Sequence, residues 1–116
     1  VRVDSSIPRS AAKAFARELG IAGERFVLEP RLYHADVPTI GRVVAALPDS
    51  AQRVMLFGHN PGFSAAVEYF SSEDLGDLPT CALVRIDFVA DGWQGTGRDL
   101  GTLVWHEYPK RLLGLE

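Results

Sequence analysis

The sequence predicts an α/β domain in which helices cover both sides of a mixed β-sheet. Three patterns predict this fold: a continuously apolar run at 54–57, two stretches with apolar residues at helical spacing, and alternating apolar and polar residues at 84–88. A continuous apolar run is typical of a strand covered on both faces, whereas alternation is typical of a strand with one wetter face. The chain has 116 residues, so we expect residues 1–116 to form a single domain.

The first quarter of the chain predicts a strand, a helix and a second strand. Residues 1–4 resemble the end of a strand, and the helix is expected over about 7–19. Its apolar positions place Leu19 on the buried side, and Gly20 is a suitable C-terminal stop. Residues 26–28 predict a short strand near a sheet edge, because a proline follows it closely.

The middle of the chain predicts helix, strand and helix in succession. Asp36 is a suitable N-cap for a helix over 37–47, the run 54–57 is the buried strand, and a glycine then leads to a helix over 62–70. Each helix carries one apolar stripe at positions i, i+3, i+4 and i+7: Ile40, Val43, Val44 and Leu47 in the first, and Phe63, Ala66, Val67 and Phe70 in the second.

The last third predicts an antiparallel hairpin. Residues 82–89 alternate as a strand, Asp91 and Gly92 form a turn, and 103–108 are the partner strand. His106 is interpreted as structural, and Cys81 as a small buried hydrophobic residue.

Composition limits the class of protein. The 12 basic and 15 acidic residues give a net charge of −3, which does not favour nucleic acid as a partner, and no apolar run approaches bilayer-spanning length. A single cysteine excludes an internal disulfide, and no signal peptide is visible. We therefore expect no membrane partner and a cytoplasmic location.

His59 and Asn60 stand between the predicted buried strand and the following helix. Ligands of open α/β sheets bind beyond the carboxyl ends of strands, and a helix start attracts anions, so His59 lies where a phosphate would be held. Arg9 lies in the first turn of its helix, where the dipole disfavours a cation unless an anion binds there too. The alternatives are a hydrogen-bonded structural histidine at position 59 and a solvated surface arginine at position 9.

Residues 58–62 (Gly-His-Asn-Pro-Gly) resemble the second histidine motif of the histidine phosphatase superfamily, in particular its phosphohistidine phosphatase branch. Residues 5–9 (Ser-Ser-Ile-Pro-Arg) are similar to the superfamily's serine-proline-x-x-arginine stretch, with the proline displaced. The resemblance runs from about residue 4 to residue 112. It implies a three-layer, phosphoglycerate mutase-like mixed sheet with helices on both faces.

The resemblance also implies a set of site residues. His59 would be catalytic, and Arg9, His59 and Asn60 would bind the phosphoryl group. Tyr33 and His34 would belong to a loop that approaches the pocket, although His34 is interpreted first as a solvated loop histidine and only second as a group that assists the leaving group. The implied substrate is a phosphorylated protein or a small phosphoester, with no metal and no cofactor.

One part of the family pattern is absent. The nucleophilic histidine of these phosphatases stands in an arginine-histidine-glycine triplet, and that triplet does not occur in this sequence. We therefore expect a chain that lacks the family's first strand and helix, belongs to a longer protein, and has no phosphatase turnover alone. The alternative of a different class is a non-catalytic phosphate-binding or protein-interaction module of the same fold.

Overall fold

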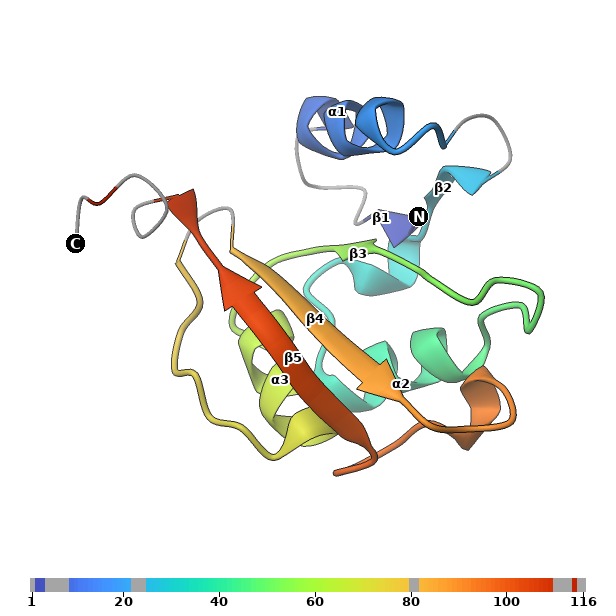
Figure 1. Ribbon diagram of the computed structural model, residues 1–116, viewed down its shortest axis with the longest axis vertical. Helices are drawn as coiled ribbons and strands as arrows, with labels where there is room; N and C mark the ends of the chain where they lie inside the picture. Colours follow the sequence, from blue (N-terminus) through green and yellow to red (C-terminus); the bar gives the residue numbers. More distant parts are fainter. Residues whose placement is uncertain (1, 4–8, 22–24, 80–81, 110–113, 115–116) are drawn as a thin grey trace.

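The computed structural model describes residues 2–3, 9–21, 25–79, 82–109 and 114, and these form a mixture of helices and short strands (Figure 1). No helix in this described part is long and apolar enough to cross a membrane. The elements follow the chain in this order: β1 (Arg2–Val3), α1 (Arg9–Glu18), β2 (Val27–Leu28), the 3₁₀ helix η2 (Pro30–Leu32), α2 (Val37–Ala45), β3 (Leu56–Phe57), α3 (Gly62–Ser71), β4 (Leu83–Phe88), the 3₁₀ helix η3 (Trp93–Gly95) and β5 (Gly101–Glu107).

Three of the strands form a parallel sheet in the order β2, β1, β3. In the central strand, Arg2 aligns with Val27 on one side and with Leu56 on the other. Among the described strands β2 lies at an edge of this sheet, which agrees with the prediction made from 26–28. In the view of Figure 1, α1 lies on the opposite side of these strands from α2 and α3.

The other two strands, β4 and β5, form an antiparallel pair, and the predicted hairpin is confirmed. Along β4, Arg85 and Asp87 are exposed, while Ile86 and Phe88 are half-buried, as the alternation predicted. The exposed residues form an ion pair of 2.8 Å between Arg85 Nε and Asp87 Oδ1. The bonds from the Arg85 guanidinium hold the pKa of Asp87 below its ordinary value.

The strands differ from the prediction in one respect: within the described residues they form two sheets rather than one mixed sheet. The predicted strand 54–57 is reduced to Leu56–Phe57, which pairs with β1. A two-residue strand offers few ladder hydrogen bonds, and the chain passes through α3 before it reaches β4. No described strand joins β3 to β4.

The core lies between α2, α3 and the hairpin. Both predicted helices are present, and their apolar stripes face each other. Phe70 of α3 packs edge-on against Phe88 of β4, with ring centroids 5.4 Å apart. The buried members of this cluster are Leu32, Ile40, Val43, Val44, Leu47, Ala66 and Phe70.

The first helix differs from its prediction at one position. Leu19 was expected on the buried side but is 58% exposed, whereas Ala16 is buried. The reason is that α1 ends at Glu18, so Leu19 lies in the terminating turn and no longer follows the helical stripe. Gly20 has a φ of +70° and donates to the Arg17 carbonyl, which confirms it as the helix stop.

Asp36 caps α2 as predicted, because its Oδ1 accepts from the Thr39 backbone N–H at 2.9 Å. Hydrogen bonds from the Thr39 side chain and amide, and the charge of Arg42, lower the pKa of Asp36. A carboxylate with a lowered folded-state pKa stabilises the fold above its unfolded pKa and loses that contribution as pH falls through the folded pKa. The contribution of Asp36 is therefore lost below about pH 4.

We predict that Asp36→Ala lowers the urea midpoint at neutral pH, and that its difference from wild type shrinks below about pH 4. Asp36→Asn is the matched control, since it keeps an acceptor oxygen but has no charge to lose. Urea titrations of the three proteins at several pH values measure both effects. A difference between Asp36→Ala and wild type that stays constant from neutral to strongly acid pH would contradict the ionised cap.

Candidate functional site

The three parallel strands end at one edge of their sheet, and each is followed by a segment that contains a predicted site residue. After β1 the chain reaches Arg9, after β2 it passes through Tyr33 and His34, and after β3 it reaches His59. Because parallel strands share the direction of their carboxyl ends, these segments leave from the same edge. This edge is the candidate site.

His59 is exposed and lies in the turn between β3 and α3. Its carbonyl accepts a hydrogen bond of 3.2 Å from the Phe63 N–H, which fixes the turn to the first residues of the helix. Gly58 has no side chain at the point where the Phe63 ring packs, and a Cβ there would collide with that ring. The glycine therefore permits the sharp change from strand to helix.

Asn60 is exposed, and its side-chain amide is engaged at both ends. Its Nδ2 donates to the Leu78 carbonyl at 2.8 Å, and its Oδ1 accepts from the Ser64 N–H at 3.1 Å and from the Ser64 hydroxyl at 2.6 Å. The Ser64 hydroxyl in turn accepts from the Leu78 N–H at 2.9 Å. The three residues form a closed set of bonds that ties the start of α3 to the loop before β4.

These bonds also occupy part of the helix start. Pro61 is the N-cap residue and provides no side-chain cap, while the amides of Phe63 and Ser64 already donate to His59 and Asn60. The dipole of α3 still directs its positive end toward this turn. An anion there would therefore depend on side chains such as His59 more than on the amides of Phe63 and Ser64.

We predict that Asn60→Ala destabilises the chain by about 1–2 kcal/mol, because it removes one donor and one acceptor that hold two segments together. Hydrogen exchange of the Ser64 amide should become faster, since that N–H loses its acceptor. Asn60→Asp is the matched control, because it keeps the acceptor and removes only the donor to Leu78. An unchanged exchange rate at Ser64 in Asn60→Ala would contradict the bond pattern.

Tyr33 and His34 follow η2 and are both exposed. Their rings meet edge-on, with centroids 4.3 Å apart, and His34 has a φ of +46°. The segment that they begin approaches the other turn closely: a Cβ on Gly62 would collide with the Ala35 carbonyl oxygen. The segment 33–36 therefore lies against the first residue of α3.

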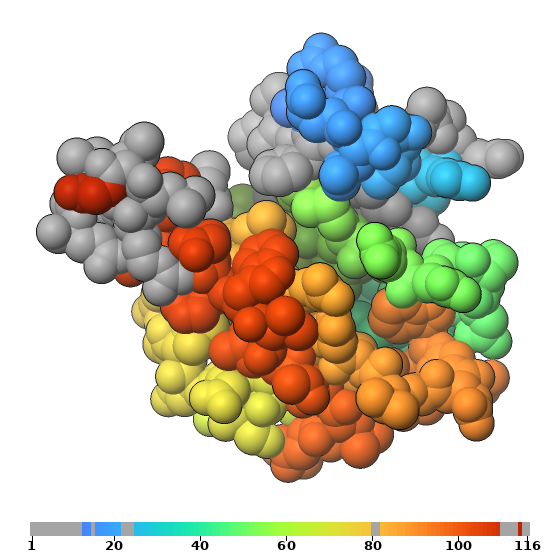
Figure 2. All heavy atoms as spheres, in the orientation of Figure 1, coloured from blue at the N-terminus to red at the C-terminus, as the bar shows by residue number. Residues whose placement is uncertain are grey.

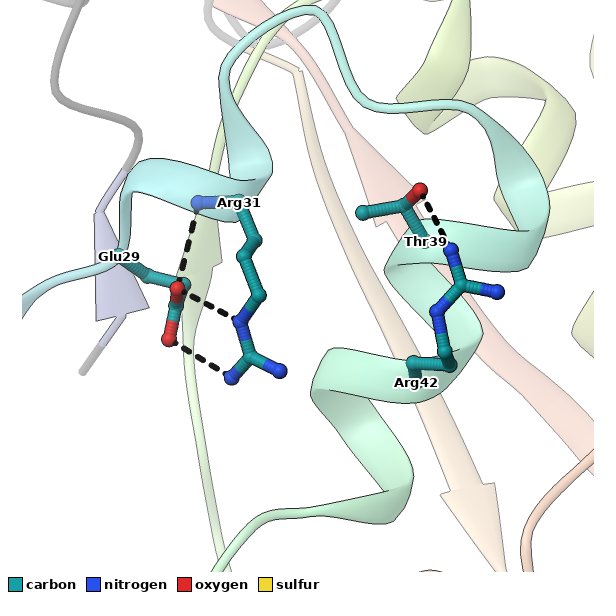
Figure 3. A network of polar contacts seen from close by, with 4 residues as sticks. All are labelled: Glu29, Arg31, Thr39 and Arg42. Atoms are coloured by element: carbon teal, nitrogen blue, oxygen red, sulfur yellow. Dashed lines mark hydrogen bonds and ion pairs between the residues drawn. The ribbon is translucent and has the colours of Figure 1, made fainter.

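The guanidinium groups of Arg31 and Arg42 are hydrogen-bonded to neighbouring side chains (Figure 3). Arg31 donates through Nε to Glu29 Oε1 at 2.9 Å and through Nη2 to Glu29 Oε2 at 3.0 Å, and these bonds raise the pKa of Arg31. Arg42 donates to the Thr39 hydroxyl at 3.1 Å. The pair of Glu29 and Arg31 was not singled out from the sequence, although the two residues stand two positions apart after the predicted strand.

Arg9 is the first residue of α1, where the sequence placed it in the first turn. Its side chain lies outside the described part of the structure, and so does the predicted convergence of the Arg9 and His59 side chains. The helix carries no acidic residue in its first turn that would pair with a cation.

Among the described residues, neither a group of possible metal ligands nor the lining of a cavity contributes further residues to the candidate site. No group of three His, Cys, Asp or Glu side chains that could hold a metal ion occurs among the described residues. A cavity of about 240 Å³ between the helices and the strands, and a second of about 590 Å³ beside η3, are lined by neither His59 nor Asn60.

Comparisons of the chain with protein-family models, with curated proteins and with solved structures found no match.

Proposed function

We propose that this chain is part of a cytoplasmic phosphatase of the histidine phosphatase superfamily, acting on phosphohistidine in a protein or on a small phosphoester. The observation that supports the proposal best is the shared edge of the parallel sheet: β1 and β3 are neighbours, and the segments after them contain Arg9 and His59. The proposal includes the finer fold, a three-layer, phosphoglycerate mutase-like arrangement with an additional central strand.

The proposed reaction has two steps. A histidine outside these 116 residues attacks the phosphorus and expels the leaving group, and water then attacks the phosphohistidine and releases inorganic phosphate. Arg9 and His59 would donate to the phosphoryl oxygens, where fixed cations and donors stabilise the charge of the transition state. Asn60 was predicted to bind phosphate as well. Since its amide is bonded to Ser64 and Leu78, its contribution in this proposal is to hold the His59 turn in place.

Phosphate binding tests the site. Titration of the 116-residue chain with inorganic phosphate, followed by phosphorus NMR, should show saturable binding. Arg9→Ala and His59→Ala should each weaken it by about tenfold or more, because a hydrogen bond to a charged group contributes about 1.5–3 kcal/mol. The controls are Arg98→Ala, whose guanidinium stacks on Tyr69, and His106→Gln in β5. Binding that is absent, or equal in all variants, would overturn the proposed site.

Turnover separates the two classes of function. The chain alone should not hydrolyse a phosphohistidine peptide, because the arginine-histidine-glycine triplet is absent. Addition of a synthetic peptide that carries this triplet after an apolar run should produce hydrolysis that requires His59. Phosphate binding without restored turnover would favour the non-catalytic module. Turnover by the chain alone, abolished in His59→Ala, would show that the chain carries its own nucleophile.

A further inference from the structure

A row of cations runs along α1. Arg9, Lys13 and Arg17 follow one another at intervals of four residues, and positions at this interval lie in one row along a helix. Lys13 and Arg17 are exposed, and neither side chain pairs with a carboxylate among the residues that the structure describes. Glu18 is the one acidic residue of α1, but it directly follows Arg17, and sequence neighbours do not face each other on a helix.

This row is unfavourable for the helix itself. Like charges four residues apart repel each other, and Arg9 in addition opposes the helix dipole at the first turn. The whole chain has a net charge of −3, so the row does not come from a general excess of basic residues. An anionic partner that lies along α1 would relieve this repulsion.

The row begins at the candidate site. α1 follows β1 and lies at the periphery of the molecule (Figure 1), and its first residue, Arg9, is the proposed phosphoryl ligand. Four residues of helix rise about 6 Å. Alternate residues of an extended polypeptide point to the same side and are about 6.6–7 Å apart. The two spacings match, so a phosphorylated residue at Arg9 would have its second and fourth neighbours beside Lys13 and Arg17.

We propose that the row formed by Arg9, Lys13 and Arg17 is a docking surface for an extended acidic segment of a phosphorylated protein. The segment has carboxylates at the second and fourth positions from its phosphorylated residue. This inference rests on the proposed function, because it takes Arg9 as a ligand of the phosphoryl group. A small phosphoester does not reach the other two cations, which lie about 6 and 12 Å further along the helix.

The charges also distinguish this occupant from nucleic acid. A nucleic-acid backbone is bound through many phosphate contacts, typically about 6–10, and the row supplies three cations in a chain whose net charge is −3. A short acidic segment with one phosphoryl group needs no more than these three.

The test uses the 116-residue chain and two nonapeptides with a central phosphoserine, which is a stable phosphoester. Each peptide has four glutamates and four threonines. In the first, the glutamates occupy the second and fourth positions on each side of the phosphoserine, and in the second they occupy the first and third. Fluorescence anisotropy should show that the first peptide binds about threefold or more tightly, because only its carboxylates match the row. At about 1 M salt, which screens exposed charges beyond about 3 Å, the difference should disappear.

Substitutions locate the docking surface. Lys13→Gln and Arg17→Gln should each weaken binding of the first peptide by about two- to fivefold, the usual contribution of an exposed ion pair. Each should change the affinity for inorganic phosphate by less than about twofold, since phosphate alone does not extend along the helix. Glutamine has nearly the helix propensity of lysine and arginine, so α1 is retained. Arg53→Gln removes an exposed arginine outside α1 and is the matched control, with no expected effect.

The outcomes separate this inference from the proposed function. Equal affinity for the two peptides, or equal losses in Arg53→Gln and in the α1 variants, would overturn the docking surface, while retained phosphate binding would leave the proposed site in place. Tighter binding of a single-stranded oligonucleotide with the same charge would overturn it in favour of nucleic acid. Absence of inorganic phosphate binding would overturn the proposed function, and this inference with it.

Discussion

Replacement of Phe70 by alanine is expected to lower the free energy of unfolding by about 3–5 kcal/mol, the usual cost of removing a buried aromatic ring. Phe70 is 6% exposed and lies where α3 meets both α2 and the hairpin. Its ring packs edge-on against Phe88 and against Tyr69, with centroids 5.4 and 5.0 Å away. The free energy of unfolding of a small domain is about 5–15 kcal/mol in total. A loss of this size should therefore leave the variant marginally stable or unfolded.

Urea denaturation followed by circular dichroism measures this loss. Phe70→Leu is the graded variant, because it keeps part of the apolar volume and should lose less. Trp105→Ala is the control for removal of an aromatic ring from the surface, since Trp105 is 40% exposed on the strand that crosses the face seen in Figure 2. Equal losses in Phe70→Ala and Trp105→Ala would mean that the core is not organised around α3.

The helices of the core were predictable because their signals are local. The stripe from Ile40 to Leu47 and the cap at Asp36 lie within about ten residues of each other, and the structure has both. The hairpin was predictable for the same reason, since alternation in β4 is a property of consecutive residues. Local periodicity determines which face of an element is buried, whatever its neighbours are.

The division into two sheets was not predictable from such signals. The run 54–57 has the composition of a strand buried on both faces, but only Leu56 and Phe57 form strand pairs in the described residues. The length of a strand depends on the neighbours available for pairing, and its own sequence does not contain them. The exposure of Leu19 was not predictable for a related reason. The turn at the end of α1 redirects a side chain that the helical period would have buried.

The candidate site was predictable in place but not in detail. The position of His59 between a strand and a helix follows from the sequence, and the structure has that order. The bonds from Asn60 to Ser64 and Leu78 join residues four and eighteen positions apart. The bond to Ser64 could have been expected, because an asparagine just before a helix is followed by a serine four residues later. The bond to Leu78 has no such local signal in the sequence.

The second large effect is expected at Gly62, the first residue of α3. A Cβ at this position would collide with the backbone carbonyl oxygen of Ala35, and backbone cannot rotate away as a flexible side chain can. Gly62→Ala should therefore cost about 3 kcal/mol, toward the upper end of the range for overpacking. This loss is opposite in sign to the ordinary effect of replacing a helical glycine by alanine.

Gly41 provides the matched control, because it lies inside α2 and a Cβ there would meet nothing within 4 Å. Gly41→Ala should stabilise the chain by about 0.5–1 kcal/mol through helix propensity alone. Urea titrations of both variants compare the same substitution in two helices of one protein. If Gly62→Ala were as stable as Gly41→Ala, the close approach of the segment 33–36 to α3 would be contradicted.

The same substitution also tests whether the two turns act as one site. To admit the methyl group, either the start of α3 or the segment 33–36 must move, so NMR shifts of Tyr33 and His59 should both change in Gly62→Ala. Gly41→Ala should leave both unchanged. Because Gly62 binds nothing itself in the proposed site, weaker phosphate binding in a folded Gly62→Ala would have to arise from displacement of these turns. Unaltered phosphate binding despite shifted turns would mean that the spacing between them does not contribute to holding the anion.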